Sequence, residues 1–390
     1  MPDLDEIKRS VESMSPAEIA PFVQNAIGTK SEVSVLDWVV GTMPVPSIGT
    51  GTLGFLKVTG AATLGVEAVE WSAVVKVMDL DETENPWGDG ASFNSPVREI
   101  EVFGSDFFDL LDGGFRAVPC YGISEMGGPA LLWMEDMSSS VPHPWSRQEF
   151  LTAARQVGYF NGSWPQEIAP VSAWLDRKFA TNRPLLASRS DFFDQVELET
   201  NVRAVSALAE KSGVSGITEM SAEYREVADS LVGLPRVICH NDLHSRNAFF
   251  RYEKSGPVTY GFDWASIGLG PAGLDGGTLA GGGLIWQAAE AKLIAEIESQ
   301  MFAEYLCGLR EAGYGFDRDQ VRLGFLSNLV PYSIAFVVAA IGMPDARVSR
   351  MYADRFGVQG DELFNQLVNR LQMFKPLFDE AVRLARQIVR

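Results

Sequence analysis

The sequence predicts an α+β fold of two lobes, a small strand-rich lobe followed by a larger helical one. Strand-like apolar runs dominate the first third, at FLKVT (55–59), VEWSAVVKVM (69–78) and PALLWMEDM (129–137). Helical spacing dominates beyond about residue 145, beginning with SRQEFLTAARQVGYFNGSW. We place the division near the last strand, with an N-terminal lobe of residues 1–135 and a C-terminal lobe of residues 136–390.

Local signals support these elements in order along the chain. SPAE, residues 15–18, is a capping box with proline at the first helical position, so it predicts the start of a helix. From Val33 the apolar period changes to two, which predicts a strand. The Gly/Asn/Pro-rich stretch ENPWGDGASFNSP then separates the strands from VREIEVFGSDFFDLL, whose spacing is helical. Residues 237–264 interrupt the helical part with two short apolar segments around a His/Asp cluster.

The net charge limits the class of partner. Lysine and arginine number 32 and aspartate and glutamate number 51, which gives a net charge of −19. A field of this sign repels phosphate backbones, so it argues against nucleic acid as a partner. It would attract a cationic small molecule, although acidic residues also simply keep a surface soluble. We therefore expect a neutral or cationic small-molecule substrate.

Cysteine usage and hydropathy indicate a cytoplasmic protein. Cys120, Cys239 and Cys307 show no C-x-x-C spacing, which suits a reducing compartment and argues against a structural zinc site. The N-terminus, MPDLDEIKRS, lacks the apolar segment of a signal peptide. The longest apolar run, SIAFVVAAIGM at 333–343, is too short to cross a bilayer and predicts a buried helix. We expect no membrane partner, and the sequence carries no signal of oligomeric state.

A glycine-rich stretch, GTGTLG, places Gly49, Gly51 and Gly54 in a G-x-G-x-x-G pattern. In a dinucleotide-binding fold these glycines lead from a strand into a helix. Here FLKVTGAATL follows, with strand character. In a kinase the glycines form a hairpin over the ATP phosphates, and a strand follows them. The strand character of this segment therefore favours ATP binding. A glycine-rich hairpin of no function is the alternative.

Lys76 lies in the middle of the apolar strand AVVKV. A lysine buried there needs a partner, because an unpaired buried charge is costly. The functional interpretation is that its ammonium pairs with nucleotide phosphates and with a glutamate on a helix. We favour Glu99 in REIEVF as that glutamate, with Glu101 as the alternative. The other interpretation of Lys76 is an edge strand with the ammonium in solvent.

The stretch HNDLHSRN is compatible with two kinds of chemistry. In a metal-bound-water site, His240, Asp242 and His244 would be the ligands. In phosphoryl transfer, Asp242 would face the acceptor hydroxyl and Asn247 would hold magnesium. Asp263 ends the next apolar segment and would supply a second, charged magnesium ligand.

Phosphoryl transfer accounts for more of these residues. A hydrolytic zinc site takes three protein ligands, and it would leave Asn247, Asp263 and Lys76 without a role. Phosphoryl transfer needs mainly positioning and charge neutralisation, which a carboxylate, a carboxamide and a second carboxylate supply. The sequence therefore favours a kinase over a metal-dependent hydrolase. His240 would then hold the loop backbone, and His244 would orient Asp242 or contact the substrate.

In this order the motifs resemble those of the aminoglycoside phosphotransferase and choline kinase-like family. The resemblance rests on GTGTLG, AVVKV, Glu99, LLWMEDM, HNDLHSRN and DWASIGLGP, and covers roughly residues 45–280. It implies a protein-kinase-like fold, with ATP and Mg²⁺ as cofactors. It also implies transfer of the γ-phosphoryl group to a hydroxyl of a small molecule such as an aminoglycoside, a sugar or an amino alcohol. Adenine would be bound by backbone groups from Glu135 to Met137.

The chain departs from the family pattern at two places. Glycine commonly follows the catalytic-loop histidine, whereas this chain has Asn241, which tolerates unusual backbone angles. The D-F-G of protein kinases is replaced by Asp263-Trp264-Ala265, as is normal for small-molecule kinases of the family. A nucleotide-binding pseudokinase that acts through partners is the remaining alternative, and the intact motifs argue against it.

Overall fold

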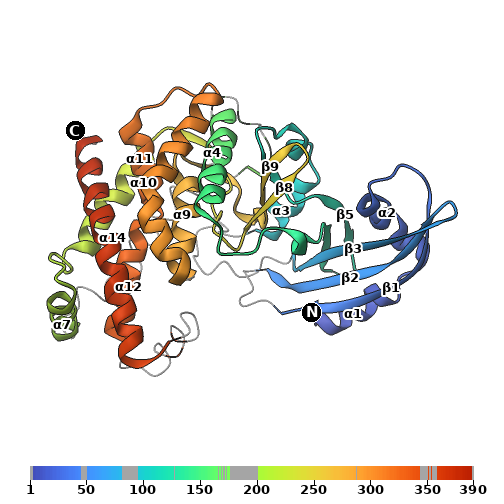
Figure 1. Cartoon of the computed structure of the whole chain (residues 1–390), viewed down its shortest axis with the longest axis horizontal. Helices are drawn as coiled ribbons and strands as arrows, with labels where there is room; N and C mark the ends of the chain where they lie inside the picture. The colour runs from blue at the N-terminus through green and yellow to red at the C-terminus, as the bar shows by residue number, and fades with distance from the viewer. Residues whose placement is uncertain are drawn as a thin grey trace. The chain divides into compact units, whose positions relative to one another are not determined.

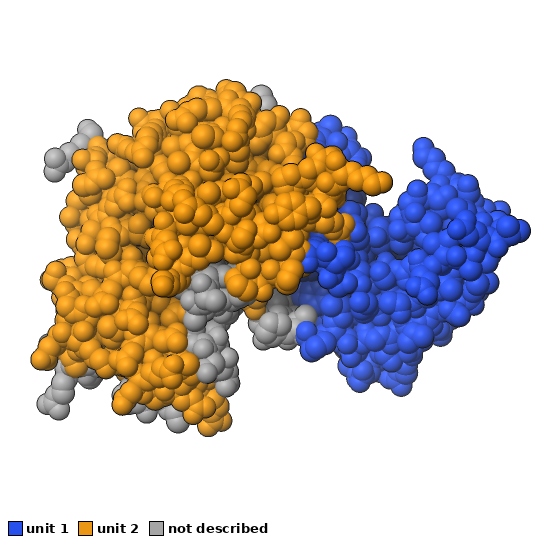
Figure 2. Space-filling view, in the orientation of Figure 1, with its two compact units in different colours: residues 1–111, 116–140, 260–266 blue, residues 112–115, 141–259, 267–390 orange. Residues whose placement is uncertain are grey.

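The computed structural model describes residues 3–44, 51–80, 95–126, 128–165, 201–286, 288–342 and 358–388, and single positions at 167, 169, 172, 174, 175, 350 and 353. The chain forms two compact units (Figure 2). Unit 1 comprises residues 1–111, 116–140 and 260–266. Unit 2 comprises residues 112–115, 141–259 and 267–390.

Unit 1 is built on a five-stranded antiparallel sheet (Figure 1). In spatial order the strands are β1 (Val33–Met43), β2 (Thr52–Leu64), β3 (Glu67–Met78), β6 (Ala130–Met134) and β5 (Cys120–Glu125). The strand runs predicted at 55–59 and 69–78 lie inside β2 and β3, and the run predicted at 129–137 contains β6. β3 therefore lies in the interior of the sheet, between β2 and β6.

Two N-terminal helices, α1 (Leu4–Glu12) and α2 (Pro16–Ile27), cover one face of this sheet. α2 begins as predicted, because Ser15 and Glu18 cap each other's backbone in a capping box. The apolar sides of both helices pack against alternate strand residues. This core includes Ile7, Val11, Ile19, Val23, Leu56, Val58, Val75 and Val77. Lys76, which lies between Val75 and Val77 on β3, points to the opposite face of the sheet.

The helix that follows the sheet's third strand is shorter than predicted. VREIEVFGSDFFDLL has helical spacing throughout, but α3 (Pro96–Phe103) ends before Gly104. Ser105 Oγ donates to Val102 O (2.7 Å) and accepts from Phe107 N–H (3.3 Å). A side chain that bonds the backbone of neighbouring residues in this way competes with helix continuation. The chain continues instead as a 3₁₀ turn, η1 (Phe107–Leu110).

Unit 2 is mainly helical. Its helices are α4 (Arg147–Ser163), α7 (Val202–Ser212), α8 (Met220–Ser230), α9 (Leu274–Trp286), α10 (Ala288–Glu311), α11 (Arg318–Ser327), α12 (Val330–Gly342) and α14 (Gly360–Ile388). Short 3₁₀ turns also occur, at η2 (Met137–Ser139) and η5 (Trp264–Ser266) in unit 1 and at η4 (Leu231–Gly233) in unit 2.

Two small sheets interrupt the helices. β7 (Arg236–Cys239) pairs antiparallel with β10 (Gly268–Pro271). A second sheet has the order β4 (Phe115–Ala117), β9 (Gly256–Gly261), β8 (Ala248–Glu253), and the division between the units falls within β4 and within β9. The connection from β7 to β8 holds the stretch HNDLHSRN. This is the local structure behind the apolar interruption predicted at 237–264.

The predicted α+β fold is confirmed, with a strand-rich first part and a larger helical remainder. The apolar run predicted to form a buried helix lies in α12, where Ile334 and Val337 are fully buried. Within the described ranges, no helix combines the length and apolar character that crossing a bilayer requires.

Candidate active site

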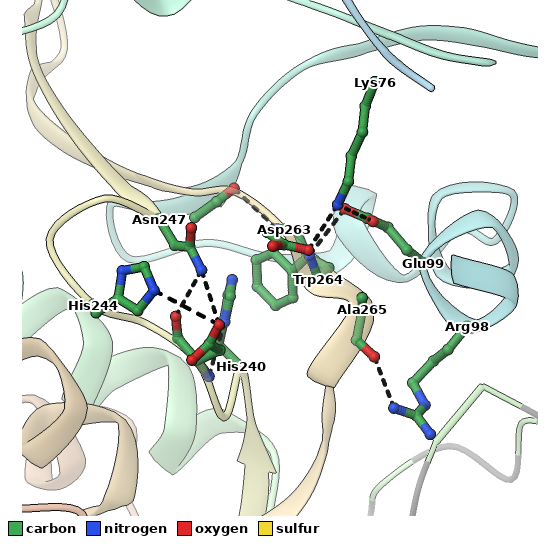
Figure 3. Close-up of polar contacts among 11 residues, drawn as sticks. Lys76, Arg98, Glu99, His240, His244, Asn247, Asp263, Trp264 and Ala265 are labelled. Carbon is green, nitrogen blue, oxygen red and sulfur yellow. Dashed lines mark hydrogen bonds and ion pairs between the residues drawn. The ribbon is translucent and has the colours of Figure 1, made fainter. Parts of the chain in front are cut away.

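Lys76 of β3 is paired with two carboxylates inside unit 1 (Figure 3). Its Nζ donates to Glu99 Oε2 at 2.6 Å and to Asp263 Oδ1 at 2.7 Å. The lysine side chain is 1% exposed, so the edge-strand interpretation is wrong. The alternative glutamate, Glu101, lies on the exposed side of α3. The structure thus joins three of the predicted site residues, Lys76, Glu99 and Asp263.

Opposing effects act on the charges of this cluster. Burial by itself lowers the pKa of Lys76, but the carboxylates of Asp263 and Glu99 outweigh burial and raise this pKa above its usual value. Burial raises the pKa of Glu99, while the Lys76 ammonium and the N–H of Trp264 favour its charged form. The Lys76 side chain is therefore a buried cation on the polar face of the sheet.

The first turn of α3 also holds the segment that carries Asp263 (Figure 3). Glu99 Oε1 accepts the Trp264 N–H at 3.1 Å. Arg98 Nη1 and the Ser95 N–H both donate to Ala265 O, at 2.7 and 3.1 Å. These bonds keep the backbone of Asp263 in the left-handed region, at φ 63°, which few residues other than glycine adopt. Trp264, which stands where protein kinases have phenylalanine, is fully buried.

Breaking this cluster provides a test of stability. We expect Glu99→Ala to lower the free energy of unfolding by about 3 kcal/mol, because a buried ion pair that loses one partner leaves an uncompensated charge. Glu101→Ala, on the exposed side of the same helix, should change it by less than about 0.5 kcal/mol. Urea denaturation of both variants measures the difference. Equal losses would show that the buried pair does not stabilise unit 1.

The glycines and the predicted base-binding segment also lie in unit 1. Gly51 has φ 76°, and a Cβ there would lie 2.2 Å from Pro96 Cγ; a Cβ on Gly54 would lie 2.6 Å from Leu4 Cδ2. Both positions therefore require glycine. Gly49 lies outside the described residues.

The segment predicted to bind adenine directly follows β6. The N–H of Glu135 donates to Pro119 O at 2.9 Å, and Met137 is buried at the start of η2. The backbone of this segment is therefore fixed at the end of the sheet.

The loop HNDLHSRN lies in unit 2 and brings Asp242 and Asn247 together. Asn247 Nδ2 donates to Asp242 O at 3.0 Å and to Asp242 Oδ2 at 3.2 Å. His244 Nε2 lies 3.8 Å from the same carboxylate oxygen. The Asp242 side chain is 24% exposed, so its carboxylate is both oriented and accessible to a substrate.

Asp275, at the start of α9, holds the backbone of the HNDLHSRN loop by hydrogen bonds. Its Oδ2 accepts the His240 N–H (2.8 Å) and its Oδ1 accepts the Asn241 N–H (2.9 Å). Asn161 Nδ2 donates to Oδ2 as well, at 2.9 Å. Burial raises the pKa of Asp275 to about 6, and these three hydrogen bonds oppose the rise. Asn241 has φ 65°, the backbone region that glycine favours.

The sequence interpretation missed Asp275. A signal was present, because this residue is the only charged one in the Gly-rich apolar stretch LGPAGLDGGTLAGGG, and a buried carboxylate needs partners. Its partners, two backbone N–H groups and Asn161, come from segments far away in the sequence. No local pattern pointed to them.

The donors present fit a hard cation. In unit 2 Asn247 has an amide oxygen beside the nitrogen that donates to Asp242, and in unit 1 Asp263 has a carboxylate. Amide and carboxylate oxygens are ligands that magnesium prefers. By contrast, across the part of the chain that the structure describes, no three His, Cys, Asp or Glu side chains are grouped so as to hold a metal ion. The metal-hydrolase alternative gains no support from HNDLH.

Comparison with known proteins identifies a family for part of the chain. Residues 163–321 match the sequence model of the phosphotransferase enzyme family. The matched region contains Asp242, Asn247, Asp263 and Asp275. Over these residues the match supports the small-molecule phosphotransferase predicted from the motifs.

Several solved structures are similar to the chain over most of its length. They include an ethanolamine kinase from Plasmodium vivax (12% identity, TM-score 0.41, 87% of this chain and 83% of that one), an amicoumacin kinase (12%, 0.48, 85% and 87%) and a choline kinase from Streptococcus pneumoniae (14%, 0.41, 86% and 93%). No curated protein matches the chain significantly.

Proposed function

We propose that this chain, whose residues 163–321 belong to the phosphotransferase enzyme family, transfers the γ-phosphoryl group of ATP to a hydroxyl of a small neutral or cationic molecule. The observation that carries the proposal is the buried Lys76, paired with Glu99 and Asp263 in unit 1. A lysine on the third strand, ion-paired to a glutamate of the following helix, is the arrangement that protein kinases require for activity.

The residues of unit 1 would bind the nucleotide. Lys76 would contact its phosphates, with Gly49, Gly51 and Gly54 forming the hairpin over them, and the glutamate would hold the ammonium in place. Backbone groups from Glu135 to Met137 would hydrogen-bond the base. Fixing the nucleotide at both ends supplies orientation, which contributes much of the rate enhancement in phosphoryl transfer.

Asp263 and Asn247 would hold magnesium. When bound, the ion neutralises charge on the phosphate oxygens during transfer. The carboxylate of Asp263 also accepts from Lys76. The amide nitrogen of Asn247 donates two hydrogen bonds to Asp242, and these bonds would orient the side chain for binding magnesium.

Asp242 would activate the acceptor. Its carboxylate would orient the substrate hydroxyl and take the hydroxyl proton as the oxygen bonds to the γ-phosphorus. The bond from that phosphorus to the bridging oxygen breaks, and ADP leaves with the electron pair. The anchoring of the loop by Asp275 keeps this carboxylate in place without contact with the substrate.

The test of this function is ADP release with ATP, Mg²⁺ and a panel of hydroxylated small molecules that spans amino sugars, amino alcohols, neutral sugars and hydroxy acids. We expect ADP release that depends on one acceptor class and produces a phosphorylated product, detected by mass spectrometry. Binding of ATP with no turnover on any class would instead favour the pseudokinase.

The charge of the acceptor has its own test. A chain with a net charge of −19 should raise the encounter rate and affinity for a cation. For a cationic acceptor we expect kcat/KM to fall as potassium chloride rises, since the screening length is about 8 Å at physiological ionic strength. A neutral analogue that bears the same hydroxyl is the matched control and should show a flat salt profile. An anionic best acceptor would contradict the inference from charge.

A further inference from the structure

A second lysine, Lys57 of β2, lies on the same face of the unit 1 sheet as Lys76. The strand register pairs Phe55 with Lys76 and Lys57 with Val74. Directly paired residues of antiparallel strands share a face, as do residues two apart on one strand. Lys57 and Lys76 therefore point to the same side, with Lys57 about 7 Å further along the strands. The neighbours Leu56, Val58 and Val75 point to the other side, into the core under α1 and α2.

The Lys57 side chain crosses β3. Its Nζ lies 2.8 Å from Oδ2 of Asp136, a residue that follows the end of β6. β2 and β6 are not neighbours, because β3 lies between them. Strands are spaced about 4.8 Å apart, so the side chain must span a gap of about 10 Å between backbones. Val74 of β3 is the register partner of Lys57 and shares its face, so the direct course of the side chain from β2 to Asp136 is across β3 near Val74, on the polar face.

Asp136 is a fixed anchor for this ammonium. Its side chain is 9% exposed and also accepts the Ser138 N–H at 3.0 Å, as the cap of η2. Burial by itself raises the pKa of Asp136, but Lys57 and Ser138 outweigh burial and lower it, so the group is a carboxylate at neutral pH. Lys57 is 40% exposed, and ion pairs with such exposure add little to folding stability.

We propose that Lys57 is a residue that positions the purine base of the nucleotide, with Asp136 holding its ammonium in place. The inference rests on the proposed function, in which phosphates lie at Lys76 and the base at Glu135 to Met137. A nucleotide bound between these two places passes beneath the stem that crosses Val74. A lysine stem is apolar and its ammonium is attracted to aromatic faces, so Lys57 would cover the ring of the base.

The test measures equilibrium binding of adenosine and of ATP with Mg²⁺ by calorimetry. Lys57→Ala removes both the methylene stem and the charge. It should weaken the binding of adenosine and of ATP by the same factor, about fivefold. Lys57→Met keeps the stem and should weaken both by less. Lys76→Met should weaken ATP and leave adenosine unchanged, because adenosine has no phosphates. Parallel losses for the two ligands assign Lys57 to the base.

Lys8→Ala is the matched control, since Lys8 forms an ion pair of the same length, 2.8 Å, with Glu12 one turn along α1 and away from the polar face of the sheet. It should bind both ligands as the wild type does. Wild-type affinity for adenosine in Lys57→Ala would overturn the inference, and tighter binding would mean that the lysine obstructs the base. If the wild type binds neither adenosine nor ATP, the proposed function fails and this inference fails with it.

Discussion

Asp242→Asn should reduce kcat by about three orders of magnitude while the Kd for ATP changes by less than about twofold. The carboxamide is nearly the same size as the carboxylate, but it cannot take the proton of the acceptor hydroxyl. The nucleotide site is assigned to other residues, so ATP binding should persist. Single-turnover phosphorylation and calorimetric ATP binding measure the two quantities separately.

His244→Gln is an informative comparison for that variant. His244 Nε2 lies 3.8 Å from Asp242 Oδ2, within ion-pair distance of the carboxylate. If the histidine only orients Asp242, its loss should reduce kcat by much less than Asp242→Asn does. Near-normal turnover in Asp242→Asn would contradict the assignment of this residue as the base. A larger loss of kcat in His244→Gln than in Asp242→Asn would assign the role of the base to His244.

Asp263→Asn should raise the magnesium concentration for half-maximal rate by more than about tenfold and lower kcat at saturating magnesium. The substitution removes the negative charge of the predicted ligand and keeps the shape of the side chain. Lys76 retains its bond to Glu99 at 2.6 Å, so the cluster keeps one ion pair. Initial rates over a magnesium series, repeated with manganese, provide the measurement.

Trp264→Phe is the matched control for Asp263→Asn. It leaves the predicted metal ligand in place and removes the Nε1–H bond to Gly261 O (2.9 Å), so the magnesium dependence should remain close to that of the wild type. An unchanged magnesium requirement in Asp263→Asn would contradict the metal role. Purified protein that contained one equivalent of zinc and hydrolysed substrates without ATP would restore the hydrolase alternative.

Local sequence was sufficient to identify Lys76 and Glu99 as partners. A lysine at the centre of an apolar strand must find a counter-charge, and the nearest helix downstream offered Glu99 on its buried side. The choice between Glu99 and Glu101 depends on helical phase, which the apolar spacing indicates. The apolar spacing did not indicate the length of that helix, because the Ser105 side chain hydrogen-bonds the backbone of Val102 and Phe107 and the helix ends at Phe103.

Other parts of the site depend on contacts between residues that are far apart in the sequence. Asp263 was predicted to be a metal ligand from its place after the loop, but nothing local indicated that it also pairs with Lys76, 187 residues away. Asp275 supports the backbone of His240 and Asn241 from 35 and 34 residues away. Its importance depends on burial beneath the loop, and burial is a property of the packed chain.

The sequence by itself determined which chemical groups are present and in what order, from the glycine hairpin through Lys76 to Asp242, Asn247 and Asp263. Residue type and spacing are local properties, and phosphoryl transfer places strict demands on both. Only the tertiary structure decided which of these groups contact one another and what holds them. Strand register sends Lys57 and Lys76 to one face, and the packing of α3 on residues 263–265 sets the backbone of Asp263. Such contacts follow from the burial of the whole sheet and its helices, which a short stretch of sequence cannot specify.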